Sequence, residues 1–283
     1  MTTEYRYSGP DGEGIDALPP AVGAAVGSEY CVHLLPGPSE MARACAAASS
    51  RGIPLVLLTP YFRDAELKRA LPLFRAIPGD ADLDVAVNDW GVLLTLRVLF
   101  PGLRLSIGRL LSGQKRCPRI ESSARLSAAE KAWHRRGLFS SAPAREYLAE
   151  VYGVTGFHVD ALEAADAPRG GAEPDPCGVG ELPGVPGKGA MPGAGAPATV
   201  FVHAPYAIVT VSDACPWLGG RSSSSVARCP RPCRDGCVVL REPSMGGDLI
   251  QRGKARFART GHPAPGEPSR DPRRRSVVYD DIP

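Results

Sequence analysis

The sequence predicts an α/β, (β/α) barrel-like fold, either a complete TIM barrel or an incomplete or distorted one. From Glu29 onward, short apolar runs alternate with amphipathic segments, which is typical of βα units around a mainly parallel sheet. The chain has 283 residues, enough for one large α/β domain with a buried core. Gly and Pro are frequent, at 32 and 29 residues, and their local excess marks a linker.

Strands and helices are expected in alternation along the chain. The strand candidates are short apolar runs: Tyr30–Leu35, Pro54–Leu58, Leu83–Val87, Leu103–Ile107, Gly156–Leu162 and Thr199–His203. The helix candidates have amphipathic periodicity: Ser39–Ser50, Arg63–Ala76, Trp90–Phe100, Ser127–Arg136 and Ala144–Tyr152.

Composition divides the chain into five segments. We expect a disordered lead-in without chemistry over 1–28 and the barrel-like core over 29–165. A flexible Gly/Pro-rich insertion follows over 166–198, because it has too few large apolar residues to fold alone. Residues 199–260 hold the remaining core strands and a Cys-rich segment. An Arg/Pro-rich tail with a short final strand occupies 261–283, where a basic tail or strand is favoured over a nucleic-acid contact.

Charge and hydropathy exclude some partners. The formal net charge of +3 is too balanced to indicate nucleic-acid binding. No apolar run approaches the roughly 18 to 20 residues of a spanning helix, and the first residues do not have the pattern of an export signal. We therefore expect a cytoplasmic protein without a membrane span, whose eight cysteines are thiols or metal ligands.

The densest chemical signal is the run Cys215-x13-Cys229-x3-Cys233-x3-Cys237. The prolines of 230–232 forbid a regular helix, so the segment is a loop. Zinc prefers Cys-x2-Cys pairs or Cys/His sets, and neither is present. Proline directly after a ligand, as after the first two of these cysteines, is common at iron–sulfur clusters. The pattern favours such a cluster, with zinc and unliganded structural or redox cysteines as alternatives.

The other cysteines have simpler interpretations. Cys45 lies in an Ala-rich helix and reads as a core residue, and Cys31 reads the same way on composition. Cys177 falls in the insertion. Cys117 follows two basic residues, which could lower its pKa, and its role stays open.

Ordered blocks of the sequence resemble peptidase family U-32, the collagenase-like peptidases. The blocks are LVLLTPYF, VAVNDWGVLLTL, LSIGRLLSGQKRCPR and HAPYAIVTVSDAC, followed by the cysteine run. They cover roughly Tyr30–Arg119 and Thr199–Phe257. In size and cysteine pattern the chain is most similar to short, UbiV-type members, which act with a longer member in oxygen-independent hydroxylation during ubiquinone biosynthesis.

The resemblance implies a [4Fe-4S] cluster, held by one early cysteine and three later ones. The later ligands fall on Cys215, Cys229 and Cys233, and the early one falls on Cys31. Cys237 departs from the family pattern and could replace Cys31 as the fourth ligand. The short members carry an Arg-rich motif after the early cysteine, which this chain does not have, so the substrate of the ubiquinone pathway is left open.

Polar residues at predicted strand ends are candidates for catalysis, because such side chains face the active site of a (β/α) barrel. Asn88 and Asp89 could orient a substrate or act as a base, and they could equally cap the next helix. Arg109 could bind a carboxylate or phosphate, or form a structural ion pair. Asp160 and Glu163 could act in catalysis or pair with an arginine of the barrel.

His203 and Tyr206 lie just before the Cys-rich segment. They could donate protons or support the cluster, and a structural role is the alternative. The family name suggests a peptidase, but the chain has neither an HExxH nor a GxSxG motif. The serines of 222–225 have no evident His/Asp pair in the sequence that would make one of them a nucleophile.

We therefore expect an iron–sulfur catalyst or partner subunit in an oxygen-independent hydroxylation. A heterodimer with a longer family member and a small organic substrate, such as a quinone precursor, are the expected partners. A peptidase or peptide-binding protein with a structural metal site is one alternative. An RNA base hydroxylation factor is a second, although the modest charge makes nucleic acid an unlikely partner.

Overall fold

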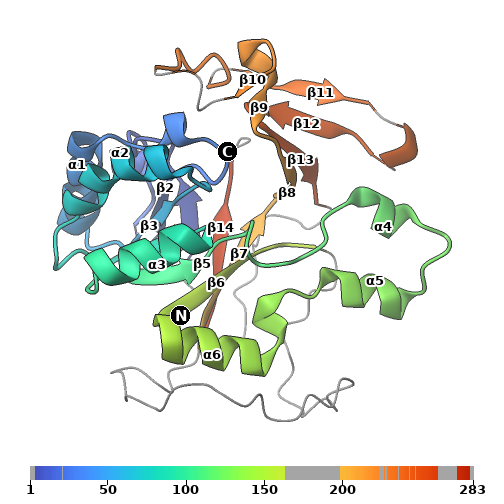
Figure 1. Ribbon diagram of the computed structural model, residues 1–283, viewed down its shortest axis with the longest axis horizontal. Helices are drawn as coiled ribbons and strands as arrows, with labels where there is room; N and C mark the ends of the chain where they lie inside the picture. The colour runs from blue at the N-terminus through green and yellow to red at the C-terminus, as the bar shows by residue number, and fades with distance from the viewer. Residues whose placement is uncertain are drawn as a thin grey trace.

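The computed structural model describes residues 4–20, 22–162, 198–222, 226, 228–234, 236–241, 243–245, 247–260 and 273–280. Within them, eight parallel strands close into a barrel in the order β1, β14, β7, β6, β5, β4, β3, β2 (Figure 1). Every neighbouring pair is parallel, including the closing pair of β1 and β14. The predicted α/β barrel is confirmed, and it is closed.

The barrel includes strands from both ends of the chain as well as from its middle. They are β1 (Glu4–Tyr7), β2 (Gly23–Gly27), β3 (Leu55–Leu58), β4 (Leu83–Val87), β5 (Arg104–Ile107), β6 (Val154–Asp160), β7 (Thr199–Ala204) and β14 (Arg274–Val278). The last of these confirms the short final strand predicted in the tail, and it completes the barrel.

Four helices lie against the outside of the barrel (Figure 1): α1 (Pro38–Ser50), α2 (Asp64–Arg75), α3 (Trp90–Leu99) and α6 (Ala142–Tyr152). Two more, α4 (Pro118–Ser122) and α5 (Ala128–Arg135), lie on an arm that extends away from it and bury none of their residues. Short 3-10 turns are η1 (Ile15–Ala17), η2 (Val32–Leu34), η3 (Leu138–Ser140), η4 (Pro216–Leu218) and η6 (Pro243–Met245). The five predicted helices are confirmed to within a few residues, and α4 was not predicted.

Successive side chains of each barrel strand point alternately outward, toward the helices, and inward, toward the centre of the barrel. In β4, Val85 and Val87 point outward and pack with Leu93 and Leu96 of α3 in the main apolar core. Burying each such side chain contributes roughly 1.5 to 3 kcal/mol. Ala86 belongs instead to the small apolar cluster inside the barrel. The inner positions are therefore where polar side chains can approach one another across the barrel.

The prediction of a disordered lead-in over 1–28 is wrong, because β1 and β2 lie there as barrel strands. Their sequences, EYRY and GAAVG, do not have the large aliphatic residues that mark the other strands. Small residues are required in β2: Gly27 has a φ of +89°, and a Cβ on it would lie 2.3 Å from the carbonyl oxygen of Leu58. The close approach of β3 explains the unusual composition.

The predicted first strand, Tyr30–Leu35, is also wrong. Its middle forms η2, and Tyr30, Cys31 and Leu34 pack in an apolar cluster with Cys233 and Phe257. The run is apolar because it contacts a second layer of structure above the barrel.

That second layer is a four-stranded antiparallel sheet in the order β11, β12, β13, β8, which we call the small sheet (Figure 1). Its strands are β8 (Tyr206–Val211), β11 (Val238–Leu240), β12 (Leu249–Arg252) and β13 (Ala255–Arg259). A hairpin of β9 (Ala214–Cys215) and β10 (Arg221–Ser222) precedes β11. Because β8 begins directly after β7, the small sheet starts at the carboxyl end of the barrel.

The candidates Glu163 and Cys177 and nearly all of the predicted insertion over 166–198 lie outside the described residues. No helix in the described ranges is long and apolar enough to cross a membrane.

Candidate functional site

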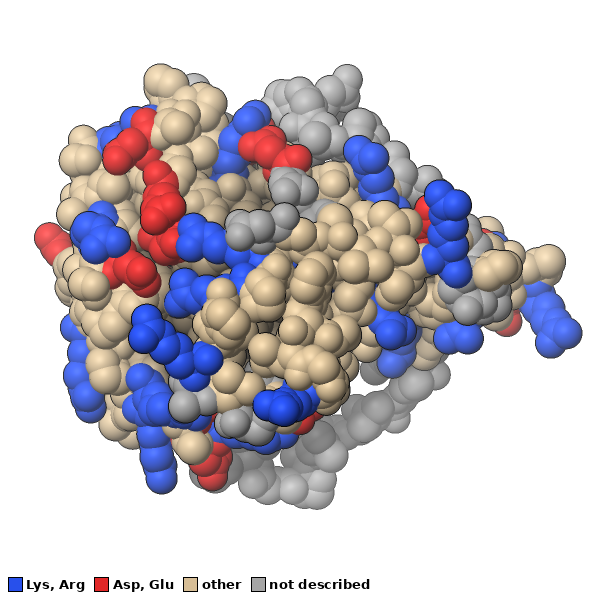
Figure 2. Space-filling view, turned by 90° about the horizontal axis from the view of Figure 1, so that it is seen from above, with Lys and Arg blue, Asp and Glu red and all other residues tan. Residues whose placement is uncertain are grey.

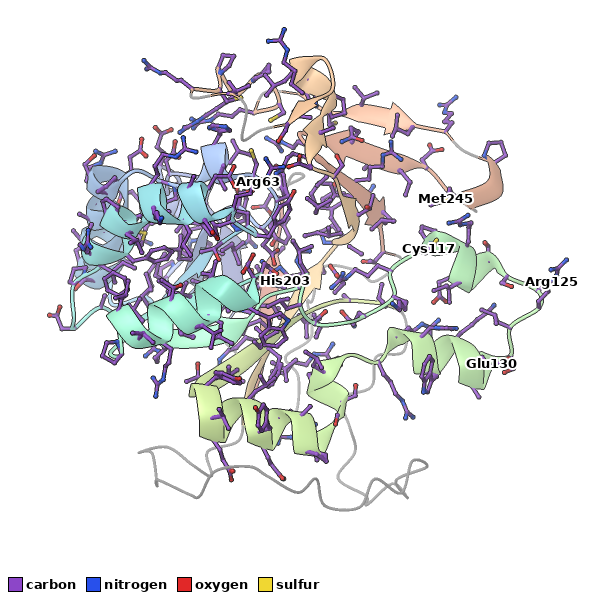
Figure 3. All side chains as sticks on the ribbon, in the orientation of Figure 1. Arg63, Cys117, Arg125, Glu130, His203 and Met245 are labelled. Carbon is purple, nitrogen blue, oxygen red and sulfur yellow. The ribbon has the colours of Figure 1, made fainter. Side chains whose placement is uncertain are left out.

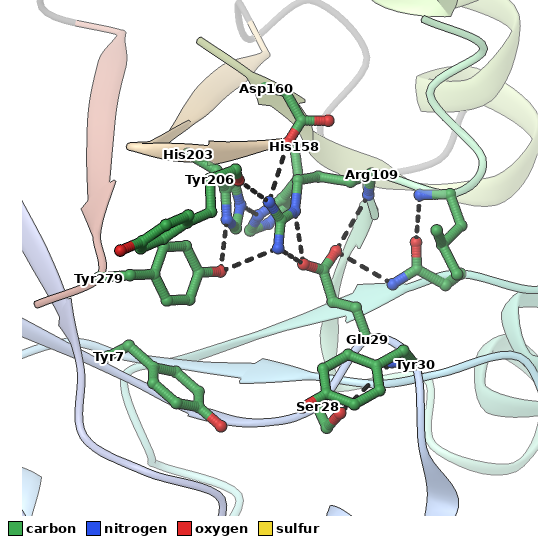
Figure 4. Close-up of polar contacts among 12 residues, drawn as sticks. Tyr7, Ser28, Glu29, Tyr30, Arg109, His158, Asp160, His203, Tyr206 and Tyr279 are labelled. Atoms are coloured by element: carbon green, nitrogen blue, oxygen red, sulfur yellow. Dashed lines mark hydrogen bonds and ion pairs between the residues drawn. The ribbon is translucent and has the colours of Figure 1, made fainter. Parts of the chain in front are cut away.

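Polar side chains from several strand ends meet at the carboxyl end of the barrel (Figure 4). Glu29 follows β2, Asn88 follows β4, Arg109 follows β5, Asp160 ends β6 and Tyr279 follows β14. Each is buried, with at most 3% of its surface exposed. Buried polar groups are stable only when they are hydrogen-bonded or paired, so these contacts define the local geometry.

Arg109 is the centre of this network. Its Nε donates to Oε2 of Glu29 at 2.6 Å, and its Nη1 donates to Oδ1 of Asp160 at 2.8 Å. Nη1 also donates to the carbonyl oxygen of Tyr206 at 2.9 Å, and Nη2 donates to the hydroxyl of Tyr279 at 3.2 Å. Of the two roles that the sequence left open for Arg109, the structural ion pair is the one present.

The charges in this network balance. Arg116 pairs with the second oxygen of Asp160, so two guanidinium groups face two carboxylates. Burial lowers the pKa of Arg109, but the charges of Glu29, Tyr279 and Asp160 outweigh it, and the pKa lies above its ordinary value. Loss of one partner would leave an uncompensated buried charge. Arg109 is therefore permanently charged and fixed in place.

Asn88 positions the loops around Arg109. Its Nδ2 donates to the carbonyl oxygen of Thr59 at 2.7 Å and to Oε1 of Glu29 at 3.2 Å. Its Oδ1 accepts from the backbone N–H of Leu110 at 2.7 Å. A Cβ on Gly108 would lie 2.4 Å from that oxygen, so glycine is required there.

Asp89 acts as a helix cap. Its Oδ1 accepts from the backbone N–H groups of Gly91 at 2.6 Å and Val92 at 3.2 Å, at the start of α3. The capping alternative is therefore the one observed for Asp89.

His203 lies in the barrel interior, near the centre of Figure 3. Its Nε2 is 2.8 Å from Nδ1 of His158, and its Nδ1 is 2.7 Å from the Tyr279 hydroxyl. Burial and the nearby charge of Arg109 lower the pKa of His158 to about 3 and hold that of His203 well below its usual range. Both rings are neutral at physiological pH. Tyr206, the other candidate beside Pro205, contributes its carbonyl oxygen to Arg109.

Sequence reasoning missed several members of this network. Asp84 interrupts the otherwise apolar strand LDVAV, and His158 stands between Phe157 and Val159 in VTGFHVD, so these interruptions could have identified them. Glu29 adjoins the segment that was interpreted as a lead-in, and Tyr279 lies within the one that was interpreted as a tail. Their role depends on strand pairings that close the barrel between chain ends, which no local pattern reveals.

Two buried cysteines, Cys31 and Cys233, have raised pKa values. Burial, together with the charges of Cys31, Cys215 and Cys229, raises the pKa of Cys233 to about 12. Burial also raises the pKa of Cys31, with smaller contributions from Cys229 and Cys215. Cys31 and Cys233 belong to one buried apolar cluster. Among the described residues, no group of three or more His, Cys, Asp or Glu side chains is close enough to hold a metal ion as it stands.

The remaining described cysteines lie in different surroundings. Cys237 is exposed, and Cys45 is buried in the main apolar core beneath α1, as expected. Cys117 precedes α4 on an arm away from the barrel centre (Figure 3), and its sulfur accepts from Nε of Arg119 at 3.3 Å.

Basic residues of the β12–β13 turn lie next to the cysteines. The charge of Lys254 lowers the pKa of Cys31, opposing the effect of burial. Nε of Arg252 donates to the carbonyl oxygen of Cys233 at 3.0 Å. Gly253 has a φ of +53°, and a Cβ on it would lie 3.3 Å from the sulfur of Cys233. This turn therefore holds the backbone at Cys233 and places a positive charge near Cys31.

Figure 2 shows the molecule from above, on the side of the small sheet. Lys and Arg side chains are spread over this face with Asp and Glu side chains among them. The mixture agrees with the small net charge of +3.

Fold and site together define a closed (β/α) barrel protein, with a buried polar network at its carboxyl end and cysteines in the segment between β8 and β11 of the small sheet. Among solved structures, the chain is similar to one described as the U32 peptidase Mk0906, with a TM-score of 0.46 and 12% sequence identity. The match covers 100% of this chain and 94% of that chain. No family model and no curated protein matches the sequence.

Proposed function

We propose that this chain binds a [4Fe-4S] cluster through Cys31, Cys215, Cys229 and Cys233 and serves as catalyst or partner subunit in an oxygen-independent hydroxylation. The observation that carries the proposal is that Cys31 and Cys233, from separate parts of the chain, pack in one buried cluster, where the charges of Cys215 and Cys229 help to raise the pKa of both. Iron–sulfur clusters are held by four thiolates of this kind. The exposure of Cys237 favours Cys31 as the fourth ligand.

The chemistry of the donor set fits a cluster. A buried thiol with a pKa of about 12, as for Cys233, ionises at neutral pH only when a metal supplies positive charge. Lys254 would offset part of the negative charge that four thiolates bring. A bound cluster would supply electron transfer, with a potential that depends on such neighbouring charges and on burial.

The chain's own residues would position the substrate. The network around Arg109 holds the strand ends at the barrel mouth in one arrangement, because each of its polar groups has a partner within the protein. A small organic molecule such as a quinone precursor, and a longer family member as second subunit, belong to the same proposal.

The contacts of Ser106 bear on the peptidase alternative, and they support it less well than the cysteines support a cluster. This serine lies 3.0 Å from Nε2 of His158 and donates to Asp84, so it contacts both residue types of a catalytic triad. It is fully buried inside the barrel, however, where a peptide cannot reach it. Its hydroxyl also donates to the carboxylate, whereas a nucleophilic serine donates to the histidine.

The proposal is tested by anaerobic purification followed by reconstitution with iron and sulfide. We expect a brown protein with about four irons per chain, the content of one [4Fe-4S] cluster. Serine substitution of Cys31, Cys215, Cys229 or Cys233 should each remove most of that iron. Cys45→Ser and Cys237→Ser are matched controls, since one thiol is in the main core and the other is exposed.

Three outcomes contradict the proposal in different ways. A colourless protein with one tightly bound zinc would replace the redox role by a structural one. Iron that survives Cys31→Ser but not Cys237→Ser would reassign the fourth ligand. Loaded protein that acts on RNA bases, with quinone precursors unchanged, would favour the RNA alternative.

A further inference from the structure

A continuous chain of hydrogen-bonding side chains crosses the barrel interior (Figure 4 shows its upper part). The chain begins at Arg109, whose Nη2 is 3.2 Å from the Tyr279 hydroxyl, and that hydroxyl is 2.7 Å from Nδ1 of His203. Nε2 of His203 is 2.8 Å from Nδ1 of His158. Nε2 of His158 is 3.0 Å from Oγ of Ser106, which contacts Oδ1 of Asp84 at the end of the chain. Each of these side chains is at least nine-tenths buried. The chain therefore joins the carboxyl end of the barrel to its opposite half through protein groups.

The two ends of this chain fix the direction of every hydrogen bond in it. A guanidinium group can only donate, so the Tyr279 oxygen accepts from Arg109, which leaves its proton available for Nδ1 of His203. At the other end an ionised Asp84 can only accept, so Ser106 donates to it. Between them, two neutral rings satisfy the pattern when each carries its proton on Nε2. All donors then point from Arg109 toward Asp84.

We propose that this chain is a proton relay, in which Tyr279 takes a proton from an O–H group at the barrel mouth and Asp84 receives one at the far end. In the step, the Tyr279 proton moves to Nδ1 of His203, and the Nε2 proton of His203 moves to Nδ1 of His158. The Nε2 proton of His158 moves to Ser106, and the Ser106 proton moves to Asp84. The O–H group at the mouth, in water or a ligand, replaces the proton on Tyr279 and is left as the anion.

The relay ends on a carboxyl group suited to exchange protons with solvent. Thr155, which is exposed, donates to Oδ2 of Asp84 at 3.1 Å and is also 3.1 Å from the carbonyl oxygen of Leu105, so it has a partner in either state of Asp84. Burial raises the pKa of Asp84 to about 6, against hydrogen bonds from Ser106 and Thr155. A group with this pKa gains and loses protons near neutral pH.

Other charged groups face Asp84 from neighbouring strands. Arg104 lowers its pKa and Asp82 raises it, and both lie at the amino ends of β5 and β4. On β1, the charge of Asp84 raises the pKa of Tyr5, and the charge of Arg275 on β14 lowers it. These charges are of mixed sign, so burial is the main influence on Asp84.

The relay does not depend on the cluster proposal, because none of its residues is a proposed ligand. At the mouth its effect would be to make Tyr279 a general base, with Arg109 stabilising the phenolate as its proton leaves. In the alternative, the same six side chains form a static hydrogen-bonded packing of the barrel interior. The two alternatives differ in whether protons move along the chain.

Nuclear magnetic resonance of protein labelled with ¹⁵N in its five histidines distinguishes them. At pH 8, where Asp84 is ionised, we expect His158 and His203 both to be neutral with the proton on Nε2. Their N–H protons should exchange with water at equal rates, since one relay event moves both. Asp84→Asn cannot take up a proton, so both rates should fall by about tenfold or more, a barrier increase of about 1.4 kcal/mol.

Two further variants keep the test decisive. Ser106→Ala interrupts the chain without removing the charge of Asp84, and it should slow both histidines as Asp84→Asn does. Thr59→Val removes another buried strand-end hydroxyl, which donates to the carbonyl oxygen of Ala86 outside the relay, and it should leave both rates unchanged. A proton on Nδ1 of either ring, unequal rates, or rates that neither Asp84→Asn nor Ser106→Ala slows would overturn the relay.

Discussion

The rings of His158 and His203 are hydrogen-bonded to each other, with Nδ1 and Nε2 2.8 Å apart, and neither ring is exposed. His158 also stacks on Phe201, with ring centroids 4.3 Å apart. A proton added to either ring would be desolvated and would lie near the charge of Arg109, which is why both pKa values are low. The barrel interior therefore resists protonation and becomes unstable in acid.

The first prediction concerns this instability. The pKa of His158 falls from 6.5 in the unfolded chain to about 3 in the folded one, so its contribution to stability is complete above pH 6.5 and is lost as the pH falls toward 3. Within that range we expect His158 to lower the free energy of unfolding by about 1.4 kcal/mol per pH unit, and His203 to add a loss of the same sign, because its pKa is also lowered. Urea unfolding of the wild type and of His158→Gln at several pH values measures the difference. Equal slopes for the two proteins would show that His158 is not held neutral.

Asp84 should have the opposite pH dependence. Its folded pKa of about 6 lies above the unfolded value of 3.8, so its favourable contribution is complete below pH 3.8 and is lost as the pH rises through 6. We expect Asp84→Asn to raise the free energy of unfolding by about 2 to 3 kcal/mol at pH 8 relative to its effect at pH 4. Asp82→Asn is the control, because Asp82 is exposed in its pair with Arg104. A pH-independent effect of Asp84→Asn would contradict the raised pKa.

Much of the barrel follows from local sequence pattern. The apolar runs of β3, β4 and β5 and the amphipathic helices α1, α2 and α3 were predicted almost to the residue, because each pattern matches one period. β1 and β2 were missed because neither has an aliphatic run: β1 is aromatic and polar, and β2 consists mainly of small residues that fit its contacts with neighbouring strands. Such contacts are tertiary and leave no periodic trace in the sequence.

The candidate site was also predictable only in part, because some of its residues follow recognisable strands and others depend on tertiary contacts. Asn88 and Arg109 follow strands directly, so their positions at the barrel mouth could be inferred from order alone. Their partner Glu29 lies at the very start of the predicted core, before its first apolar run, and Tyr279 comes from the predicted tail. Pairing across a separation of 80 or 170 residues depends on barrel closure.

Removing the positive charge at the mouth should be costly. Arg109→Met leaves the buried Glu29 without its main partner, and we expect it to lower the free energy of unfolding by about 3 to 5 kcal/mol. Adding Glu29→Gln to Arg109→Met should recover part of that loss. Arg104→Met, which removes an exposed ion pair with Asp82, should cost about 1 kcal/mol or less. Chemical denaturation of the four proteins tests this, and similar losses for Arg104→Met and Arg109→Met would contradict the buried network.

The last prediction concerns the contact between Gly108 and Asn88. A Cβ at Gly108 would lie 2.4 Å from Oδ1 of Asn88, and the backbone of both residues is held in adjacent strand ends, so the amide must move. Moving it breaks the bond from Leu110 N–H and the contact with Glu29, which supports Arg109. We expect Gly108→Ala to cost about 1 to 3 kcal/mol, the usual range for overpacking.

Gly102→Ala is the matched control for Gly108→Ala, because a Cβ there meets no atom within 4 Å. We expect its stability to lie within about 0.5 kcal/mol of wild type, as for other surface changes. In Gly108→Ala the Nε–H resonance of Arg109 should also shift, since the Glu29 carboxylate loses its hydrogen bond from Asn88. If Gly108→Ala is as stable as Gly102→Ala and leaves that resonance in place, Asn88 does not couple the strand end to the buried ion pair.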